Sequence, residues 1–234
     1  MARQVHRRPS GVSRAVVDLD FGAILVDWRM LAKGVAWTLG LTAISATAGI
    51  ALGVGCAWAR IHGPVWMKAV TGAYVELFRN TPFIVQLFFI FFGLPAMGFR
   101  LSPEAASILA MVVNLGAYAT EIIRAGIEAT PRGQVEAALS LALSRMQTFF
   151  HVVLPPALRK VWPALVSQII IVMLGSSVCG QISTEELSFA ANLIQSRNFR
   201  AFEAFIVAAL IYLALSIALR RLLNWLGPRF LFGD

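Results

Sequence analysis

The chain has 234 residues, of which 58% are hydrophobic and only 14% are charged. A chain of this composition cannot bury its apolar side chains in one water-soluble core, so we expect an all-α integral membrane protein. The net charge of +8 is typical of basic residues that flank membrane spans, and we predict no nucleic-acid partner. Cys56 and Cys179 lie in apolar runs, and neither a disulfide nor a metal site is predicted.

The first 33 residues form a basic and amphipathic lead. Met1 to Ser10 are basic but are not followed by an apolar run that ends in a small-residue cleavage site, so we expect no removable signal peptide. A helix lying on the membrane surface is predicted over residues 17–31 from the spacing of Val17, Phe21, Ile24, Trp28 and Leu31. We therefore divide the chain into a lead (1–33), a membrane domain (34–226) and a short tail (227–234).

Runs without charged residues locate the spans, because an ionised side chain at mid-bilayer costs about 2.5 to 3.5 kcal/mol on insertion scales. Helices rising about 1.5 Å per residue cross a hydrocarbon layer of roughly 30 Å within such runs. Five spans are predicted, over 34–59, Asn80–Phe99, Ala105–Thr120, Val161–Thr184 and Ala204–Leu219. In the first span, the spacing of Gly49 and Gly53 is typical of close helix packing.

The second span begins with Asn80-Thr81-Pro82. Pro82 removes a backbone donor and leaves polar backbone that protein or water must cover. The break therefore either lines a translocation path or marks a simple helix start at the membrane boundary. Two acid–base pairs three residues apart, Glu76 with Arg79 and Glu121 with Arg124, are interpreted as charge pairs at that boundary in preference to contacts with a substrate.

Several motifs are absent from the sequence. No Gly-x-x-x-x-Gly-Lys-Ser/Thr occurs, so we expect any ATP and Mg²⁺ to be bound by a separate chain. The three histidines fall outside the spans and no acid interrupts the middle of a span, which disfavours a proton-driven transporter. Neither a nucleophile with a base nor a metal cluster is present, so we predict a protein that is not an enzyme and holds no cofactor.

The segment between the third and fourth spans carries the most specific pattern. Glu136-Ala137-Ala138 is followed by Ala142, and then by Val152, Leu154 and Pro155. This resembles the EAA loop of ABC importer permeases, in which Gly stands at the position of Ala142 and Ile at that of Val152. Five further segments resemble the polar amino acid (histidine/glutamine/glutamate) branch of that family, so that the similarity covers roughly residues 35–226. They are Arg79-Asn80-Thr81-Pro82, Val85 to Phe89, Gly116-Ala117-Tyr118, Gly133-Gln134 and Glu186-Leu187.

The resemblance implies a cytoplasmic coupling loop, in which a short helix around Glu136–Leu143 docks on an ABC ATPase dimer. Positive φ at the usual glycine would be costly for Ala142, and Pro155 would stand at the start of the fourth span. The coupling residues so implied are Gly133, Glu136, Ala137, Ala138, Ala142, Leu154 and Pro155. The further implied partners are a second permease, identical or homologous, and a periplasmic amino-acid-binding protein.

Polar residues of the spans have two possible roles, as ligands for a zwitterionic amino acid or as interhelical hydrogen-bonding groups. The candidates for the substrate path are Asn80, Thr81, Gln86, Asn114, Gln168, Ser176 and Ser177. The resemblance predicts a permease subunit of an ATP-driven importer for polar amino acids. The alternative is a self-sufficient secondary transporter or channel for small polar solutes, which needs neither an ATPase nor a binding protein.

Orientation follows from the basic residues and the loop. Eleven of the 20 Lys and Arg residues lie on the side of the segment 124–160, and six of the other nine precede the first span. Apart from the lead, the basic residues favour that side as cytoplasmic. We therefore expect a multi-pass protein of the bacterial inner membrane with its N-terminus outside and its C-terminus in the cytoplasm.

Overall fold

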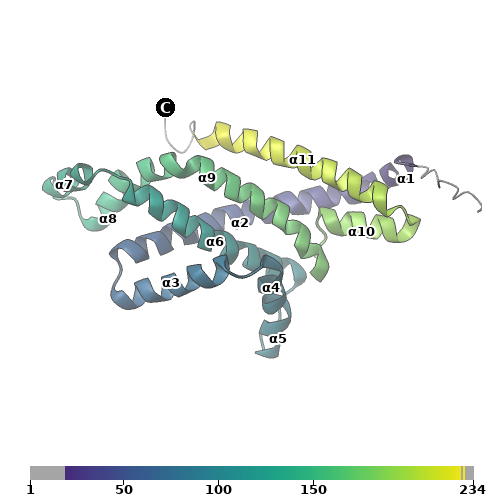
Figure 1. The fold of residues 1–234 in the computed structure, drawn as a ribbon, viewed down its shortest axis with the longest axis horizontal. Helices are drawn as coiled ribbons and strands as arrows, with labels where there is room; N and C mark the ends of the chain where they lie inside the picture. The colour runs from purple at the N-terminus through teal and green to yellow at the C-terminus, as the bar shows by residue number, and fades with distance from the viewer. Residues whose placement is uncertain (1–18, 228, 230–234) are drawn as a thin grey trace, which may run out of the picture.

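A computed structural model describes residues 19–227 and residue 229, and every regular element in these residues is helical. Figure 1 shows their order. The first half contains α1 (Gly22–Leu25), α2 (Trp28–His62), α3 (Val65–Arg79), α4 (Phe83–Phe88), the π-helical turn η1 (Phe89–Gly93), α5 (Leu94–Ala96) and α6 (Pro103–Glu128). The second half contains α7 (Arg132–Ser140), α8 (Arg145–Gln147), the π-helical η2 (Thr148–Val153), α9 (Leu154–Gly175), the 3₁₀-helical η3 (Ser176–Ile182), α10 (Leu187–Asn198) and α11 (Ala201–Leu226).

The described residues contain four helices long and apolar enough to cross a membrane, namely α2, the run Arg145–Ile182, α6 and α11. A fifth span is formed if α3 and the segment Phe83–Ala96, which meet at 112°, count as one broken span. The prediction of an all-α protein is therefore confirmed, and the predicted number of five spans is reached when the bent pair counts as one span. The second predicted span differs in extent, because residue 80 lies at the bend and α3 precedes it.

Helices α2 and α6 pack closely because α2 presents glycines to α6. A Cβ added to Gly49 would lie 3.0 Å from the Leu115 side chain, and one added to Gly53 would lie 2.7 Å from the Cβ of Ala119. These distances leave no room for a side chain on α2 at either position. The prediction that Gly49 and Gly53 serve helix packing is confirmed.

The lead differs from the surface helix predicted for residues 17–31. Among its described residues, α1 ends at Leu25 and α2 already begins at Trp28, so the domain boundary proposed at 33/34 falls within a helix. Ile24 and Leu31 are buried in a cluster with residues of α10 and α11. Their apolar side chains therefore meet helices of the same chain instead of lipid. Residues 1–18, including Val17, lie outside the described residues.

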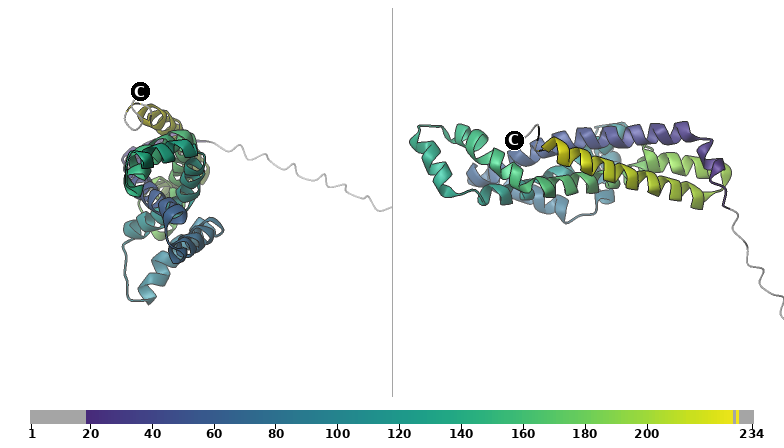
Figure 2. Two further views of the ribbon diagram at one scale, coloured as in Figure 1. Left: turned by 90° about the vertical axis from the view of Figure 1, so that its left-hand side faces the viewer. Right: turned by 90° about the horizontal axis from the view of Figure 1, so that it is seen from above.

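The molecule is elongated, and its two ends carry different elements (Figures 1 and 2). At one end, the C-terminal ends of α2 and α6 meet α7, α8 and the start of α9. At the other end, α1 and α10 lie beside the start of α11. Pro155 and Pro156 stand in the first turn of α9, directly after the π-helical η2.

Candidate functional site

A cavity of about 360 Å³ lies where the break between α3 and α4 faces α6 and α9. It brings together Thr81, Asn114 and Gln168, three of the candidates for the substrate path. The complete lining is Thr81, Pro82, Phe83, Met111, Asn114, Tyr118, Gln168, Ile171, Val172 and Gly175. No charged side chain is among these residues, so the cavity offers amide and hydroxyl groups within an apolar wall.

The residues of α6 and α9 that line the cavity follow the helical period. On α6, Met111, Asn114 and Tyr118 follow a three- and four-residue spacing. On α9, the same spacing runs from Gln168 to Gly175. Residues so spaced share one helix face. Met111, Tyr118 and the apolar residues of α9 were not expected in the path, although their spacing from Asn114 and Gln168 would have identified them.

The break itself is held by side chains. The last four carbonyls of a helix lack partners within it, and in α3 side chains donate to all four. The pairs are Asn80 Nδ2 to the Glu76 carbonyl (2.8 Å), Thr81 Oγ1 to Leu77 (2.7 Å), Gln86 Nε2 to Phe78 (2.8 Å) and Tyr118 Oη to Arg79 (3.4 Å). The polar backbone exposed by Pro82 is thus covered by protein.

The Asn80-Thr81-Pro82 segment lies both at a helix start and at the cavity wall. Pro82 is the N-cap residue of α4, so the segment is a helix start, and Thr81 and Pro82 also line the cavity. Gln86 lies behind the cavity wall, 6% exposed, where its Oε1 accepts a hydrogen bond from Asn114 Nδ2 at 2.9 Å. Asn114, which lines the cavity, therefore binds Gln86, whose amide donates to the Phe78 carbonyl at the break.

Two further candidates for the path lie outside this cavity. Ser176 is fully buried, and its hydroxyl donates to the Met173 carbonyl at 2.7 Å. The Ser177 hydroxyl donates to the Leu174 carbonyl at 2.8 Å. Serine hydroxyls often bond to the preceding turn in this way, and here they do so where α9 passes into η3. Gly175 is the residue of this region that lines the cavity.

A second cavity of about 480 Å³ adjoins the first and is charged. We call it the vestibule, and Arg60, Val75, Glu76, Arg79, Asn80, Tyr118 and Glu121 line it. Glu121 accepts hydrogen bonds from Arg60 and, at 2.8 Å, from Arg124. The predicted pair of Glu121 and Arg124 is confirmed. No ion pair joins Glu76 to Arg79 in the described residues; instead the Arg79 guanidinium lies 5.5 Å from the centre of the Tyr118 ring.

The segment resembling the EAA loop forms an arm made of α7, α8 and η2, in which a tight turn joins α7 to α8. The Leu143 amide donates to the Ala138 carbonyl (3.2 Å) and the Ala142 amide donates to that of Leu139 (3.0 Å), which is the Schellman pattern of a helix end. Ala142 has a φ of 59°. Glycine is favoured at this position of the pattern because it lacks the Cβ that makes positive φ costly.

The turn is followed by a capping box. The Gln147 amide donates to Ser144 Oγ at 3.3 Å, and the Ser144 amide donates to Gln147 Oε1 at 2.8 Å. This reciprocal pair satisfies two donors at the start of α8. The direction in which the chain leaves the turn is therefore set by local hydrogen bonds on both sides of Ala142.

Ala142→Gly should stabilise this turn by about 0.5 to 1 kcal/mol, because relief of the left-handed strain outweighs the added backbone entropy. Amide exchange of residues 139–147 should slow by about twofold to fivefold. The matched control is Ala137→Gly, which places glycine in the right-handed interior of α7 and should accelerate exchange. Faster amide exchange in both variants would contradict the inference that the positive φ of Ala142 destabilises the turn.

Some of the predicted coupling residues are exposed on the outer face of the arm, and others are buried on its inner face. Gly133, Glu136 and Ala137 are exposed, whereas Ala138 is only 4% exposed and so faces the chain itself. Leu154 belongs to a buried cluster with residues of α2 and α6, and Pro155 is exposed. Of the predicted coupling residues, Ala138 and Leu154 therefore position the arm, while the others are accessible to a partner.

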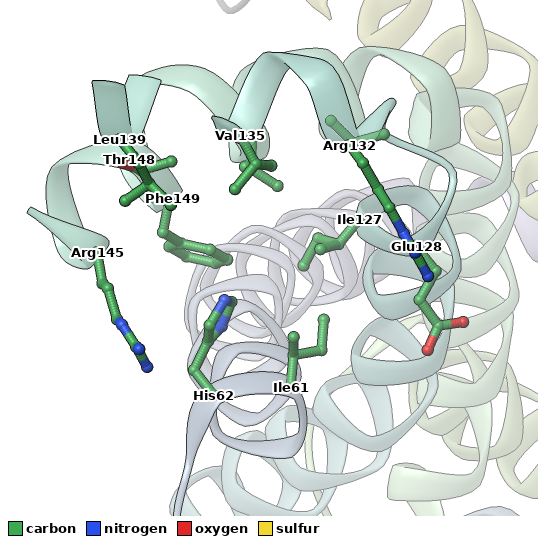
Figure 3. A pocket seen from close by; sticks show the side chains of 12 residues that line it. Ile61, His62, Ile127, Glu128, Arg132, Val135, Leu139, Arg145, Thr148 and Phe149 are labelled. Atoms are coloured by element: carbon green, nitrogen blue, oxygen red, sulfur yellow. The ribbon is translucent and has the colours of Figure 1, made fainter. Parts of the chain in front are cut away.

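The arm is seated on the ends of α2 and α6 around a cavity of about 600 Å³ (Figure 3). The Phe149 ring of η2 meets the His62 ring edge to face at 5.9 Å. Ile61, Ile127 and Val135 line the same cavity. Apolar and aromatic contacts thus join the arm to α2 and α6.

Comparison with known proteins agrees with this architecture. The family model for the binding-protein-dependent transport system inner membrane component matches residues 49–232. The glutamine transport system permease protein GlnP of Escherichia coli K12 is 34% identical over 216 residues, covering 91% of this chain and 98% of that protein. The L-cystine transport system permease protein TcyB of Bacillus subtilis is 37% identical over 186 residues, covering 79% and 80%.

Solved structures share the fold. The crystal structure of an amino acid ABC transporter with histidines aligns with a TM-score of 0.81 at 32% identity, covering 91% of this chain and 99% of that one. A chain of the MetNI methionine ABC transporter in an inward-facing conformation has a TM-score of 0.65 at 20% identity, which is a likeness of fold alone. The family and the apolar helices make this a multi-pass inner-membrane protein. The chain belongs to the family of binding-protein-dependent transport system inner membrane components.

Proposed function

We propose that the chain is the permease subunit of an ATP-driven ABC importer for polar amino acids. The observation that carries the substrate class is the uncharged cavity at the helix break, into which Thr81, Asn114 and Gln168 bring polar groups. Amides and hydroxyls both donate and accept hydrogen bonds, so one such site can hold an ammonium and a carboxylate together. Its volume of about 360 Å³ lies within the usual range for small-molecule sites.

The exposed outer face of α7 supports the rest of the proposal. A short helix with Gly133 and Ala137 exposed allows close approach of a partner, and we assign this face to an ABC ATPase dimer that binds ATP and Mg²⁺. A second permease, identical or homologous, completes the membrane part. A periplasmic binding protein delivers the amino acid at the opposite end, so the N-terminus lies outside and the C-terminus in the cytoplasm.

The proposal is tested by reconstituting the permease in lipid vesicles with its ATPase and binding protein. Uptake of glutamine, cystine and other labelled amino acids is then measured with and without ATP. We expect uptake that requires ATP, the ATPase and the binding protein, with the ATPase binding from the side on which α7 projects. Equal uptake without ATP would support a self-sufficient transporter or channel instead. Binding of the ATPase to the opposite side would overturn the orientation.

Asn114→Leu and Gln168→Leu should each reduce uptake or change the order of preferred amino acids. Loss of a hydrogen bond to a charged group costs about 1.5 to 3 kcal/mol, so the apparent KM should rise about tenfold to 100-fold. Ser177→Ala is the matched control, because its hydroxyl bonds to its own helix outside the cavity. Lost assembly with an unchanged order of substrates would assign Asn114 and Gln168 to helix packing.

A further inference from the structure

Tyr118 is the residue that the uncharged cavity and the charged vestibule have in common. The two cavities lie on either side of the same short break, since Thr81 lines the cavity and its neighbour Asn80 lines the vestibule. The half-buried Tyr118 ring therefore lies at the boundary between the two cavities.

The Tyr118 side chain is held by two contacts with one residue of α3. Its hydroxyl donates to the Arg79 carbonyl at 3.4 Å, and the Arg79 guanidinium stands 5.5 Å from its ring centre. The hydrogen bond is longer than the 2.7 to 2.8 Å typical of hydroxyl donors, and a cation–π contact at an exposed arginine is modest. Contacts of this kind hold one conformation while remaining easy to release.

The vestibule lies on the side of the cavity toward the arm. Glu121, one turn beyond Tyr118 on α6, accepts from Arg60. Arg60 is two residues before His62, which ends α2 and packs against Phe149 of the arm. The order along the molecule is therefore cavity, Tyr118, vestibule and arm.

We propose that Tyr118 and Arg79 form a gate between the cavity and the vestibule, through which substrate leaves toward the ATPase side. The inference rests on the proposed function for the identity of what passes. The gate opens when the Arg79 end of α3 moves away from α6, which separates the Tyr118 hydroxyl from its acceptor and the ring from the guanidinium. The break between α3 and α4 permits this movement, and α6 leads directly into the arm.

The same helix pair offers a matched control. The Tyr74 hydroxyl of α3 donates to the Val113 carbonyl of α6 at 2.6 Å, so it also ties α3 to α6 through one tyrosine hydroxyl. Tyr74 lines neither the cavity nor the vestibule. If Tyr118 only fastened the two helices, removing either hydroxyl would have a similar effect.

The gate is tested by accessibility in the complete complex, with Cys56 and Cys179 replaced by Ala and Val172→Cys as the reporter within the cavity. A membrane-impermeant methanethiosulfonate reagent is added on the side to which the ATPase binds. Tyr118→Phe should raise the rate of reporter modification about twofold to threefold, the lower end of the effect of losing one hydrogen bond, because this bond is long. Tyr118→Ala should raise it further, because the ring and its contact with Arg79 are also lost. Tyr74→Phe should leave the rate unchanged.

An unchanged rate in the Tyr118 variants, or an equal rise in Tyr74→Phe, would overturn the gate. If Tyr118→Ala does not assemble, Tyr118→Phe decides, because it keeps the ring and its volume. The thiol reaction requires no substrate. If the gate is wrong, the modification rates do not change as expected but the parent complex still shows ATP-driven uptake. If the proposed function is wrong, uptake is absent although the modification rates change as expected.

Discussion

Gly53→Val is expected to destabilise the permease strongly. A Cβ at this position would stand 2.7 Å from the Cβ of Ala119 and 3.1 Å from the Thr120 amide nitrogen. Part of this contact is backbone, so α2 and α6 cannot relieve it by rotating a side chain and must separate. Overpacking of a core costs about 1 to 3 kcal/mol even where side chains can adjust. We expect the upper end of that range or more.

Gly55→Val is the matched control, because a Cβ on Gly55 meets nothing within 4 Å. It makes the same chemical change two residues away in the same helix. The unfolding temperature of the purified complex should fall by roughly 6 to 12 °C for Gly53→Val, or no monodisperse protein should be recovered. Equal behaviour of the two variants would contradict the close packing of α2 against α6.

Ala137→Arg is expected to stop transport while leaving the fold intact. Ala137 is exposed on the outer face of α7, so a long cation there disturbs no contact within the chain. If this face docks on the ATPase, the cation occupies space that a close interface requires. Interface residues of central importance contribute 2 kcal/mol or more, so ATP-driven uptake should fall by at least about 30-fold and the ATPase should no longer co-purify.

Two controls separate coupling from folding. Ser196→Arg adds the same charge to an exposed position of α10, at the opposite end of the molecule, and should leave co-purification of the ATPase unchanged. Ala138→Arg places the charge at a buried position and should instead reduce the amount of folded protein. Normal uptake and normal ATPase binding in Ala137→Arg would exclude docking through this face.

The sequence alone determined the class of the protein. Runs without charge predicted the spans, because the cost of placing charge in lipid is local and can be read residue by residue. The four-residue spacing of Gly49 and Gly53 predicted that they serve close helix packing, because residues on one face of a helix repeat with the helical period. The resemblance in the segment around Glu136 predicted the family that the comparisons then showed.

Only the tertiary structure decided which polar residues share a cavity. Asn114 and Gln168 lie on different helices, and the rotation of each helix about its axis follows from packing that no local pattern encodes. The same holds for Ala138, whose neighbours in sequence are exposed while it is buried, and for Tyr118, which covers a carbonyl 39 residues away in sequence. Local sequence indicates which segments are helical and which surfaces lipid tolerates, whereas the meeting of distant side chains depends on how all the helices pack together.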